Sequence, residues 1–212
     1  MREKEKSTQI IYVRHGVTDF PLDRIYCDDR EDPALNELGV AQAQQAALRL
    51  KETQIDLIVA SPYLRTRMTA EAIAQATGAP LEFNKALRER GFGIWDGLYF
   101  NEIETGYPED FLRWKQNPAD FKPENGESVH DLLRRVSSVI SDITTHHKGK
   151  CVAVVAHVGP IRACLCDALN IPIKHYRQLC VDYASSSRVD YGKSQNNFIY
   201  MNQTHAVADN HP

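Results

Sequence analysis

The sequence predicts an α/β fold, a three-layer sandwich with helices on both faces of a mostly parallel β-sheet. Short runs of β-branched and aliphatic residues, which are typical of buried strands, alternate along the chain with segments of helical periodicity. Strands connected through helices in this way usually become parallel neighbours in one sheet. A chain of 212 residues has room for one such domain with a substantial core. We therefore expect a single domain over residues 1–212.

The composition argues against several classes of partner. The net charge is −3, so no general basic surface indicates nucleic acid or phospholipid binding. No apolar run is as long as a membrane span, and the charged first six residues lack the apolar stretch of a signal peptide. The five cysteines follow no disulfide or zinc spacing, which favours a reducing cytoplasm. We expect a cytoplasmic protein without a nucleic-acid or membrane partner.

The first half of the chain is predicted to contain three strands and two helices. The strands cover residues 10–13, 55–60 and 81–83, and a polar loop over residues 18–33 follows the first of them. Asn36 suits the N-cap of a helix over residues 37–51, and Gly78 suits the end of a helix over residues 63–77. Residues 87–97, which include three glycines, are predicted to be a loop.

The second half begins with a small helical insertion, predicted at about residues 98–125. It would contain short helices near residues 101–104 and 109–116. Ser128 and Asp131 form a capping-box pattern, and the apolar stripe that follows predicts a strongly amphipathic helix. Residues 151–156 are the most apolar strand, followed by a helix over residues 161–169. Weaker alternation indicates strands at residues 178–183, 187–190 and 197–201, and a polar tail begins at about residue 203.

Basic side chains follow three of the predicted strands. Arg14, His15 and Gly16 follow the first strand, the second leads to Arg65, and His157 follows the strand at residues 151–156. Open α/β sheets bind their ligands at the carboxyl ends of the strands. Two arginines and two histidines would repel one another there unless an anion lay between them, and phosphate matches both guanidinium groups. A metal site is the competing interpretation of two histidines, but the arginines would repel a cation.

Five motifs occur in order along the chain, from about residue 10 to about residue 170. They are the Arg-His-Gly motif at residues 14–16 with Thr18, residues 61–66 with Thr69 and Ala70, residues 87–89 with Trp95 to Gly97, residues 125–128, and residues 154–157. Each is weak alone, but together they resemble the signatures of the histidine phosphatase superfamily, the phosphoglycerate-mutase-like proteins. The resemblance implies a phosphoglycerate-mutase-like fold and a phosphatase that needs neither metal nor cofactor.

The resemblance also implies a role for each basic residue. His15 would be the nucleophile that takes the phosphoryl group, and Glu89 would be the general acid and then the base. Arg14, Arg65 and His157 would bind the phosphate oxygens. In the loop after the nucleophile, Gly16 and Thr18 would also bind the substrate, which is expected to be a small phosphorylated metabolite.

Two alternatives remain open beside hydrolysis. Family members that interconvert phosphoglycerates carry a long insertion between the acid and the Gly-Glu-Ser motif, whereas only residues 89–126 separate them here. A mutase must exclude water, so the short insertion favours a phosphatase such as an α-ribazole, sugar or broad-specificity enzyme. The segment at residues 89–93 does echo the mutase pattern, so mutase-type phosphoryl transfer is the second hypothesis. A non-catalytic phospho-ligand-binding protein is the third, although it would be expected to lack His15 or Glu89.

At some positions the chain departs from the family pattern. Pro21 stands where an asparagine is common, Cys27 and Asp28 where Gly-Gln is common, and Val158 where a glycine is common. Other residues near the motifs are assigned structural roles. Arg88 and Arg90 are expected in surface ion pairs, with Arg90 alternatively facing the pocket, His130 is expected to face solvent, and Tyr99, Phe100, Tyr107, Phe111 and Trp114 are expected to pack the insertion. Exposed aromatic residues near Trp114 would be compatible with a homodimer.

Overall fold

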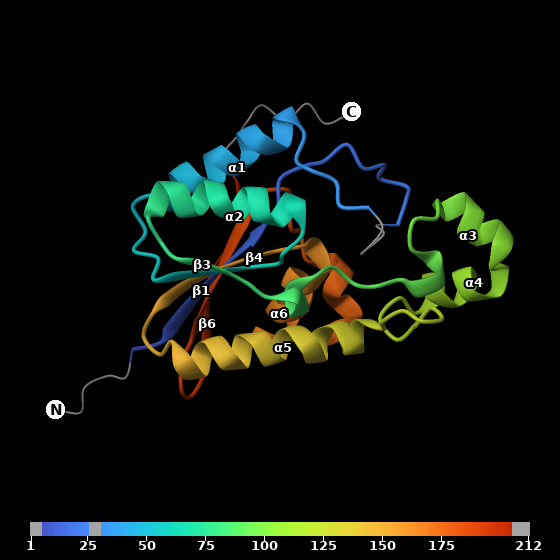
Figure 1. Cartoon of the computed structure of the whole chain (residues 1–212). Helices are drawn as coiled ribbons and strands as arrows, with labels where there is room; N and C mark the ends of the chain where they lie inside the picture. Colours follow the sequence, from blue (N-terminus) through green and yellow to red (C-terminus); the bar gives the residue numbers. More distant parts are fainter. Residues whose placement is uncertain (1–5, 26–30, 205–212) are drawn as a thin grey trace.

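The computed structural model describes residues 6–25 and 31–204, which form a six-stranded sheet with helices on both faces (Figure 1). The strands are β1 (Thr8–Arg14), β2 (Leu57–Ala60), β3 (Leu81–Phe83), β4 (Cys151–Ala156), β5 (Ser186–Tyr191) and β6 (Asn196–Gln203). The α-helices are α1 (Glu37–Leu50), α2 (Leu64–Thr77), α3 (Phe100–Gly106), α4 (Pro108–Gln116), α5 (Val129–His146) and α6 (Val158–Ala168). The predicted fold class is confirmed. Cys27, Asp28 and the tail beyond residue 204 lie outside the described residues.

The sheet is parallel over four strands and antiparallel at one edge. Its order is β3-β2-β4-β1-β5-β6, with β3, β2, β4 and β1 parallel, β5 antiparallel to β1 and β6 antiparallel to β5. The predicted strands at residues 187–190 and 197–201 are confirmed as β5 and β6. The predicted strand at residues 178–183 is wrong: a 3-10 helix (Ile173–Gln178) ends there, and an irregular segment leads into β5.

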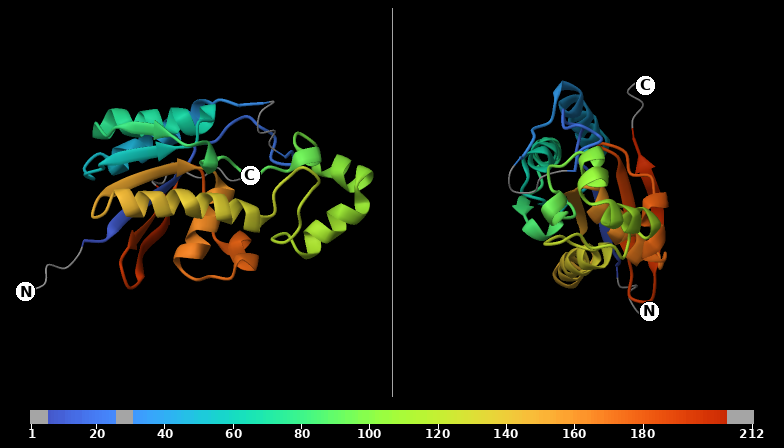
Figure 2. Two further views of the ribbon diagram at one scale, coloured as in Figure 1. Left: turned by 60° about the horizontal axis from the view of Figure 1, so that its bottom comes forward. Right: turned by 90° about the vertical axis from the view of Figure 1, so that its right-hand side faces the viewer.

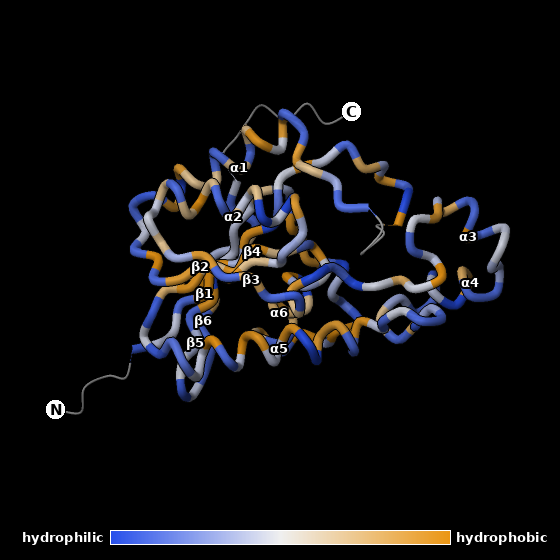
Figure 3. Tube along the Cα trace, in the orientation of Figure 1, coloured by the Kyte–Doolittle hydropathy of each residue, from blue (hydrophilic) through white to orange (hydrophobic). Residues whose placement is uncertain are grey.

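Alternating residues of β1 face two separate hydrophobic layers. Ile10 and Tyr12 belong to the cluster that the sheet forms with α5 and α6, and Ile11 and Val13 belong to the cluster formed with α1 and α2. All four side chains are buried, as the uninterrupted apolar run requires. Figure 3 shows this apolar centre between the two helical layers. The core therefore fixes β1 and β4 rigidly up to the residues at which they end.

Local capping signals set the helix boundaries. The Asn36 side chain accepts a hydrogen bond from the Gly39 N–H at 2.8 Å, and Gly78 ends α2 in the left-handed region with φ 72°. Ser128 and Asp131 form the predicted capping box of α5. Helix α6 begins at Val158, three residues before the predicted start. Pro160 falls in its first turn, where the missing N–H leaves no helical bond unmade.

The insertion forms a small helical unit with its own apolar centre. Trp95, Phe111 and Trp114 are buried there, together with Ile25 from the loop after β1. Figure 2 shows α3 and α4 projecting beyond the main layers, at the end of the sheet toward which β1 runs. The predicted packing role of Phe111 and Trp114 is confirmed. Trp114 contributes little exposed aromatic surface, because it is buried. Tyr99, which was also expected to pack the insertion, is instead 37% exposed.

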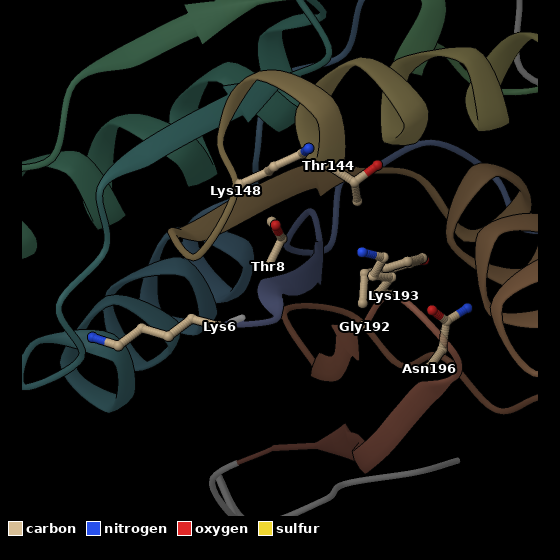
Figure 4. A pocket seen from close by; sticks show the side chains of 8 residues that line it. Lys6, Thr8, Thr144, Lys148, Gly192, Lys193 and Asn196 are labelled. Carbon is tan, nitrogen blue, oxygen red and sulfur yellow. The ribbon is translucent and has the colours of Figure 1, made fainter. Parts of the chain in front are cut away.

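A polar cavity of about 340 Å³ lies at the opposite end of the sheet (Figure 4). It is lined by Thr8 at the start of β1 and by Thr144, Lys6, Lys148 and Lys193, among others. The length of β1 separates this cavity from the residues that follow the strand. No helix in the described part of the chain is long and apolar enough to cross a membrane.

Candidate active site

His15 is the first residue after β1, and both its backbone and its ring are fixed. Its N–H donates to the Ala156 carbonyl at 3.1 Å, and its carbonyl accepts from the Ala184 N–H at 3.1 Å. The ring is 3% exposed, and its Nδ1 lies 2.7 Å from the Gly16 carbonyl oxygen. A carbonyl can only accept, so Nδ1 carries the proton and the neutral ring keeps its lone pair on Nε2. This is the tautomer that a nucleophilic histidine needs.

His157 lies beside His15 because β1 and β4 are paired in register. Arg14 pairs with Ala156, so the residues that follow the two strands are neighbours, and their imidazole centroids are 5.2 Å apart. His157 Nε2 lies 2.9 Å from Ser61 Oγ at the end of β2. Its Nδ1 is buried without a hydrogen-bond partner in the described structure. Buried polar atoms are normally paired, so this nitrogen is available to hydrogen-bond with a substrate.

Two arginines, the buried Arg65 and the half-buried Arg14, complete the cluster. Arg65 lies in the first turn of α2, is 2% exposed, and has its Nη1 3.7 Å from Asp32 Oδ1. Arg14 ends β1 and donates from Nη1 to the Val181 carbonyl at 2.7 Å. Its guanidinium lies 3.6 Å from the centroid of the Tyr183 ring. Both cations are therefore held in fixed positions next to the two imidazoles.

The cluster keeps both imidazoles neutral. Burial, and then the charges of Arg65 and Arg14, hold the pKa of His15 well below its ordinary value. Burial, Arg65 and His15 lower the pKa of His157 in the same way. A bound phosphate would reverse the repulsion between these groups. The site therefore has the electrostatics of an anion site, with a neutral nucleophile.

Gly16 and Thr18 lie in the loop directly after His15, packed against α1 and α2. The Gly16 N–H donates to Thr69 Oγ1 at 3.2 Å, and a Cβ at Gly16 would lie 2.4 Å from the Gly39 carbonyl oxygen. Only glycine permits that approach. Thr18 is buried, and its Oγ1 accepts from the Phe20 N–H at 3.3 Å. The structure brings both residues to the edge of the site, and their substrate contacts remain a prediction.

Glu89 is joined to the cluster through the first turn of α6. Its Oε2 accepts from the Gly159 N–H at 3.1 Å, and its Oε1 accepts from the Arg90 N–H at 2.8 Å. Gly159 is two residues from His157, so the carboxyl group lies at the rim of the same site. A Cβ at Gly159 would be 2.1 Å from Glu89 Oε1, so glycine at this position leaves room for the carboxyl group to lie where it does.

An arginine that the sequence did not single out holds the Glu89 segment. Arg135 on α5 donates to the carbonyl oxygens of Ala86, Arg88 and Glu89 at 2.7, 2.9 and 2.8 Å. It also forms an ion pair with Glu127 at 2.8 Å. No sequence motif marks Arg135, since its partners are mostly backbone carbonyls. Tyr183 was missed for a related reason, because it comes from an irregular segment.

Of the other charged residues near the motifs, Arg88 and His130 lie as expected, and Arg90 does not. Arg88 pairs with Glu127 at 2.9 Å, and His130 is exposed, with Nε2 2.8 Å from Asp120. Arg90 is not in a surface ion pair: it is 4% exposed and donates to the carbonyl oxygens of Glu127, Phe121 and Pro118. It ties the insertion to the Glu89 segment. Among residues 6–25 and 31–204, no group of three or more His, Cys, Asp or Glu side chains could hold a metal ion.

The fold and the cluster at this sheet edge define an α/β enzyme of phosphoryl chemistry. Residues 10–204 match the model of the histidine phosphatase superfamily (branch 1). The chain belongs to that family, as its five motifs predict, and its class is that of the hydrolases of phosphoric monoesters.

Relatives with several names share most of the chain. Phosphoserine phosphatase 1 of Hydrogenobacter thermophilus is 31% identical over 92% of this chain and 92% of its own length. Probable phosphoglycerate mutase GpmB of Escherichia coli is 33% identical over 88% of this chain and 86% of its own length. The solved structure of a mycobacterial glucosyl-3-phosphoglycerate phosphatase is similar, with a TM-score of 0.82 and 26% identity, over 94% of this chain and 100% of that one.

Proposed function

We propose that the protein hydrolyses phosphoric monoesters of small metabolites without a metal ion, through a phosphohistidine intermediate on His15. The observation that carries the proposal is the fixed ring of His15, which keeps its Nε2 lone pair available beside Arg14, Arg65 and His157. The arginines supply the positive charge that a metal ion supplies in other phosphatases.

The first step transfers the phosphoryl group to the enzyme. His15 Nε2 attacks phosphorus, a P–N bond forms, and the P–O bond to the alcohol breaks. Glu89, protonated at this stage, gives its proton to the departing oxygen. Arg14, Arg65 and His157 stabilise the charge on the three equatorial oxygens.

The second step returns the enzyme to its starting state. The Glu89 carboxylate takes a proton from water as the water oxygen attacks phosphorus, and the P–N bond breaks to release inorganic phosphate. Splitting one displacement into two suits phosphate monoesters, whose spontaneous hydrolysis is among the slowest that enzymes accelerate.

The test combines turnover with trapping of the intermediate. Wild-type protein should release p-nitrophenol from p-nitrophenyl phosphate in the presence of EDTA. When it is quenched with alkali during turnover of a ³²P-labelled substrate, it should carry an acid-labile phosphoryl group. His15→Ala should lose both signals, whereas Lys148→Gln, at the opposite end of the sheet, should keep both. Full activity of His15→Ala, or a strict need for a divalent metal ion, would contradict the mechanism.

Phosphoglycerate mutase activity is the second candidate, favoured by the similarity to the relative named probable phosphoglycerate mutase GpmB. A mutase would convert 3-phosphoglycerate into 2-phosphoglycerate faster than it released phosphate. Phosphorus NMR of one reaction mixture distinguishes the two products. We expect inorganic phosphate to be the main product, because a short insertion leaves the phosphoenzyme accessible to water.

A further inference from the structure

A cavity of about 200 Å³ opens directly beside Glu89, on the side where the leaving group of a substrate would lie. Its wall includes Val158 and Gly159, the two residues that follow His157, so the cavity lies next to the phosphate cluster. Apolar side chains from three other parts of the chain, among them Ile25, Phe92 and Leu132, form further walls. The rest of any substrate whose ester oxygen contacts Glu89 is directed into this space.

Four arginines line this cavity, and two of them have no acidic partner among residues 6–25 and 31–204. Arg90 is committed to three backbone carbonyls, and Arg24 forms a paired interaction with Glu31 at 2.8 and 2.6 Å. Arg162 and Arg177 contact no carboxylate among the described residues. The cavity thus holds more positive charge than its single carboxylate, Glu89, can balance.

Both of these arginines are held in place by neutral groups. Arg162, half-buried on α6, donates from Nε to the Leu179 carbonyl at 2.7 Å. Arg177 lies over the Trp114 ring at 4.7 Å and donates from Nε to the Tyr176 hydroxyl at 3.3 Å. Contacts at Nε orient the guanidinium without neutralising it. An oriented guanidinium fork beside apolar walls is suited to binding an anionic oxygen pair.

We propose that Arg162 and Arg177 bind a carboxylate of the substrate, so that the substrates are short phosphomonoesters bearing a carboxylate a few bonds from the ester. This inference rests on the proposed function, because it uses the same Glu89 and the same phosphate position. Glu89 in the same cavity disfavours a second phosphate, which carries more negative charge than a carboxylate. The small volume disfavours a long leaving group.

The experiment compares substrates that differ by one carboxylate. Phosphoserine and phosphoethanolamine form one such pair, and 3-phosphoglycerate and glycerol 3-phosphate form another. We expect wild-type protein to prefer the acid of each pair by at least about tenfold in kcat/KM, the effect of one charge-assisted hydrogen bond. Fructose 1,6-bisphosphate against fructose 6-phosphate tests a second phosphate, and a preference for the bisphosphate alone overturns the carboxylate assignment.

The variants Arg162→Gln and Arg177→Gln test the two residues separately. Each should reduce the preference for the acid to a few-fold at most. The matched control Arg134→Gln removes the same charge from the exposed face of α5 and should keep the wild-type preference. Arg177 is exposed, so its variant tests the site even if Arg162→Gln fails to fold.

Two outcomes separate this inference from the proposed function. If wild-type protein cleaves p-nitrophenyl phosphate but shows ratios near one for both pairs, the carboxylate site is overturned and the phosphatase stands. The same holds if the acid preference survives both variants. If wild-type protein cleaves no phosphomonoester, including the aryl phosphate, the proposed function itself fails.

Discussion

At the scale of single residues, the two arginines of the site are held by different groups. Arg14 lies on the Tyr183 ring and donates to the Val181 carbonyl, and Arg65 is 3.7 Å from Asp32. A ring face and a carbonyl orient a guanidinium while its charge remains available to a ligand. The guanidinium of Arg14 is therefore oriented before any anion binds.

The Tyr183 ring is predicted to matter for this preparation. Tyr183→Ala should raise the KM for p-nitrophenyl phosphate by about five- to thirtyfold, since a cation–π contact between partly buried groups contributes about 1–2 kcal/mol. Tyr183→Phe keeps the ring and should behave like wild type. Steady-state kinetics of the three proteins measure the effect. Equal KM values for wild type and Tyr183→Ala would show that the carbonyl contact alone orients Arg14.

The two buried imidazoles predict how stability depends on pH. Their pKa values are lowered in the fold from an ordinary value of 6.5, so between that value and the folded pKa the unfolded chain binds more protons. The stabilisation is fully present above pH 6.5 and is lost as the pH falls through the folded pKa. The free energy of unfolding should therefore fall on acidification, by at most about 1.4 kcal/mol per pH unit for each imidazole.

Urea unfolding in phosphate-free buffer at pH 7.5 and 5.5 measures this loss. His157→Asn should lose less stability over that interval than wild type, because one of the two imidazoles is gone. Carboxylates titrate equally in both proteins and cancel in the difference. The same pH dependence in the two proteins would mean that His157 titrates normally in the fold.

The sequence predicted His15, Arg14, Arg65 and His157 as neighbours because each follows, or lies just beyond, a strand whose apolar run is unmistakable. Parallel pairing then brings strand ends together without any knowledge of side-chain packing. Tyr183 could not be found in this way. Its contact with Arg14 spans 169 positions of the chain, and nothing in the residues around it specifies that distance.

At the scale of elements, the incorrect strand at residues 178–183 has a physical reason. Val181 is buried while Cys180 and Asp182 are exposed, so the segment alternates as a strand does. Both edges of β1 are already paired, with β4 and β5, so the segment cannot pair with β1. Its irregular backbone instead offers the Val181 carbonyl to Arg14. Alternation in the sequence predicts which side chains are buried. It does not predict whether the backbone has a neighbouring strand to hydrogen-bond with.

The start of α6 gives a prediction about Glu89. In Gly159→Ala the new methyl group would lie 2.1 Å from Glu89 Oε1, so the carboxyl group must move from its place. We expect kcat to fall by at least about tenfold, since a general acid contributes 10²–10⁴-fold. Thermal unfolding should change little, because alanine favours the helix by about 1 kcal/mol over glycine.

Gly106→Ala is the matched control for this substitution. Gly106 ends α3, and a Cβ there would meet nothing within 4 Å. Its kcat should equal that of wild type. A Gly159→Ala enzyme with unchanged kcat would show that Glu89 tolerates the displacement, and would remove it from the acid role.

At the scale of the whole molecule, the two ends of the sheet carry different kinds of positive charge. The carboxyl end gathers the buried Arg65 and the half-buried Arg14 around the imidazoles, whereas the amino end gathers lysines around the cavity of Figure 4. Lysine is a strongly hydrated point charge, and arginine is a fork that can be held in the interior. Two places could therefore attract phosphate, but the groups at the carboxyl end have been removed from water and repel one another without it.

Inorganic phosphate should stabilise the protein through the carboxyl end alone. A ligand that binds only the folded state adds RT ln(1 + [L]/Kd), about 2.7 kcal/mol at a hundredfold excess over Kd, so the melting temperature should rise with phosphate. Sodium chloride at equal ionic strength controls for screening, which acts on exposed charges at either end. Arg65→Gln should lose most of the increase, and Lys148→Gln should keep it. If phosphate and chloride raised the melting temperature equally, or if Lys148→Gln lost the increase instead, the anion site would lie elsewhere than around His15. Retention of the increase in Lys148→Gln and its loss in Arg65→Gln would instead locate the bound phosphate at Arg65, next to the proposed nucleophile His15.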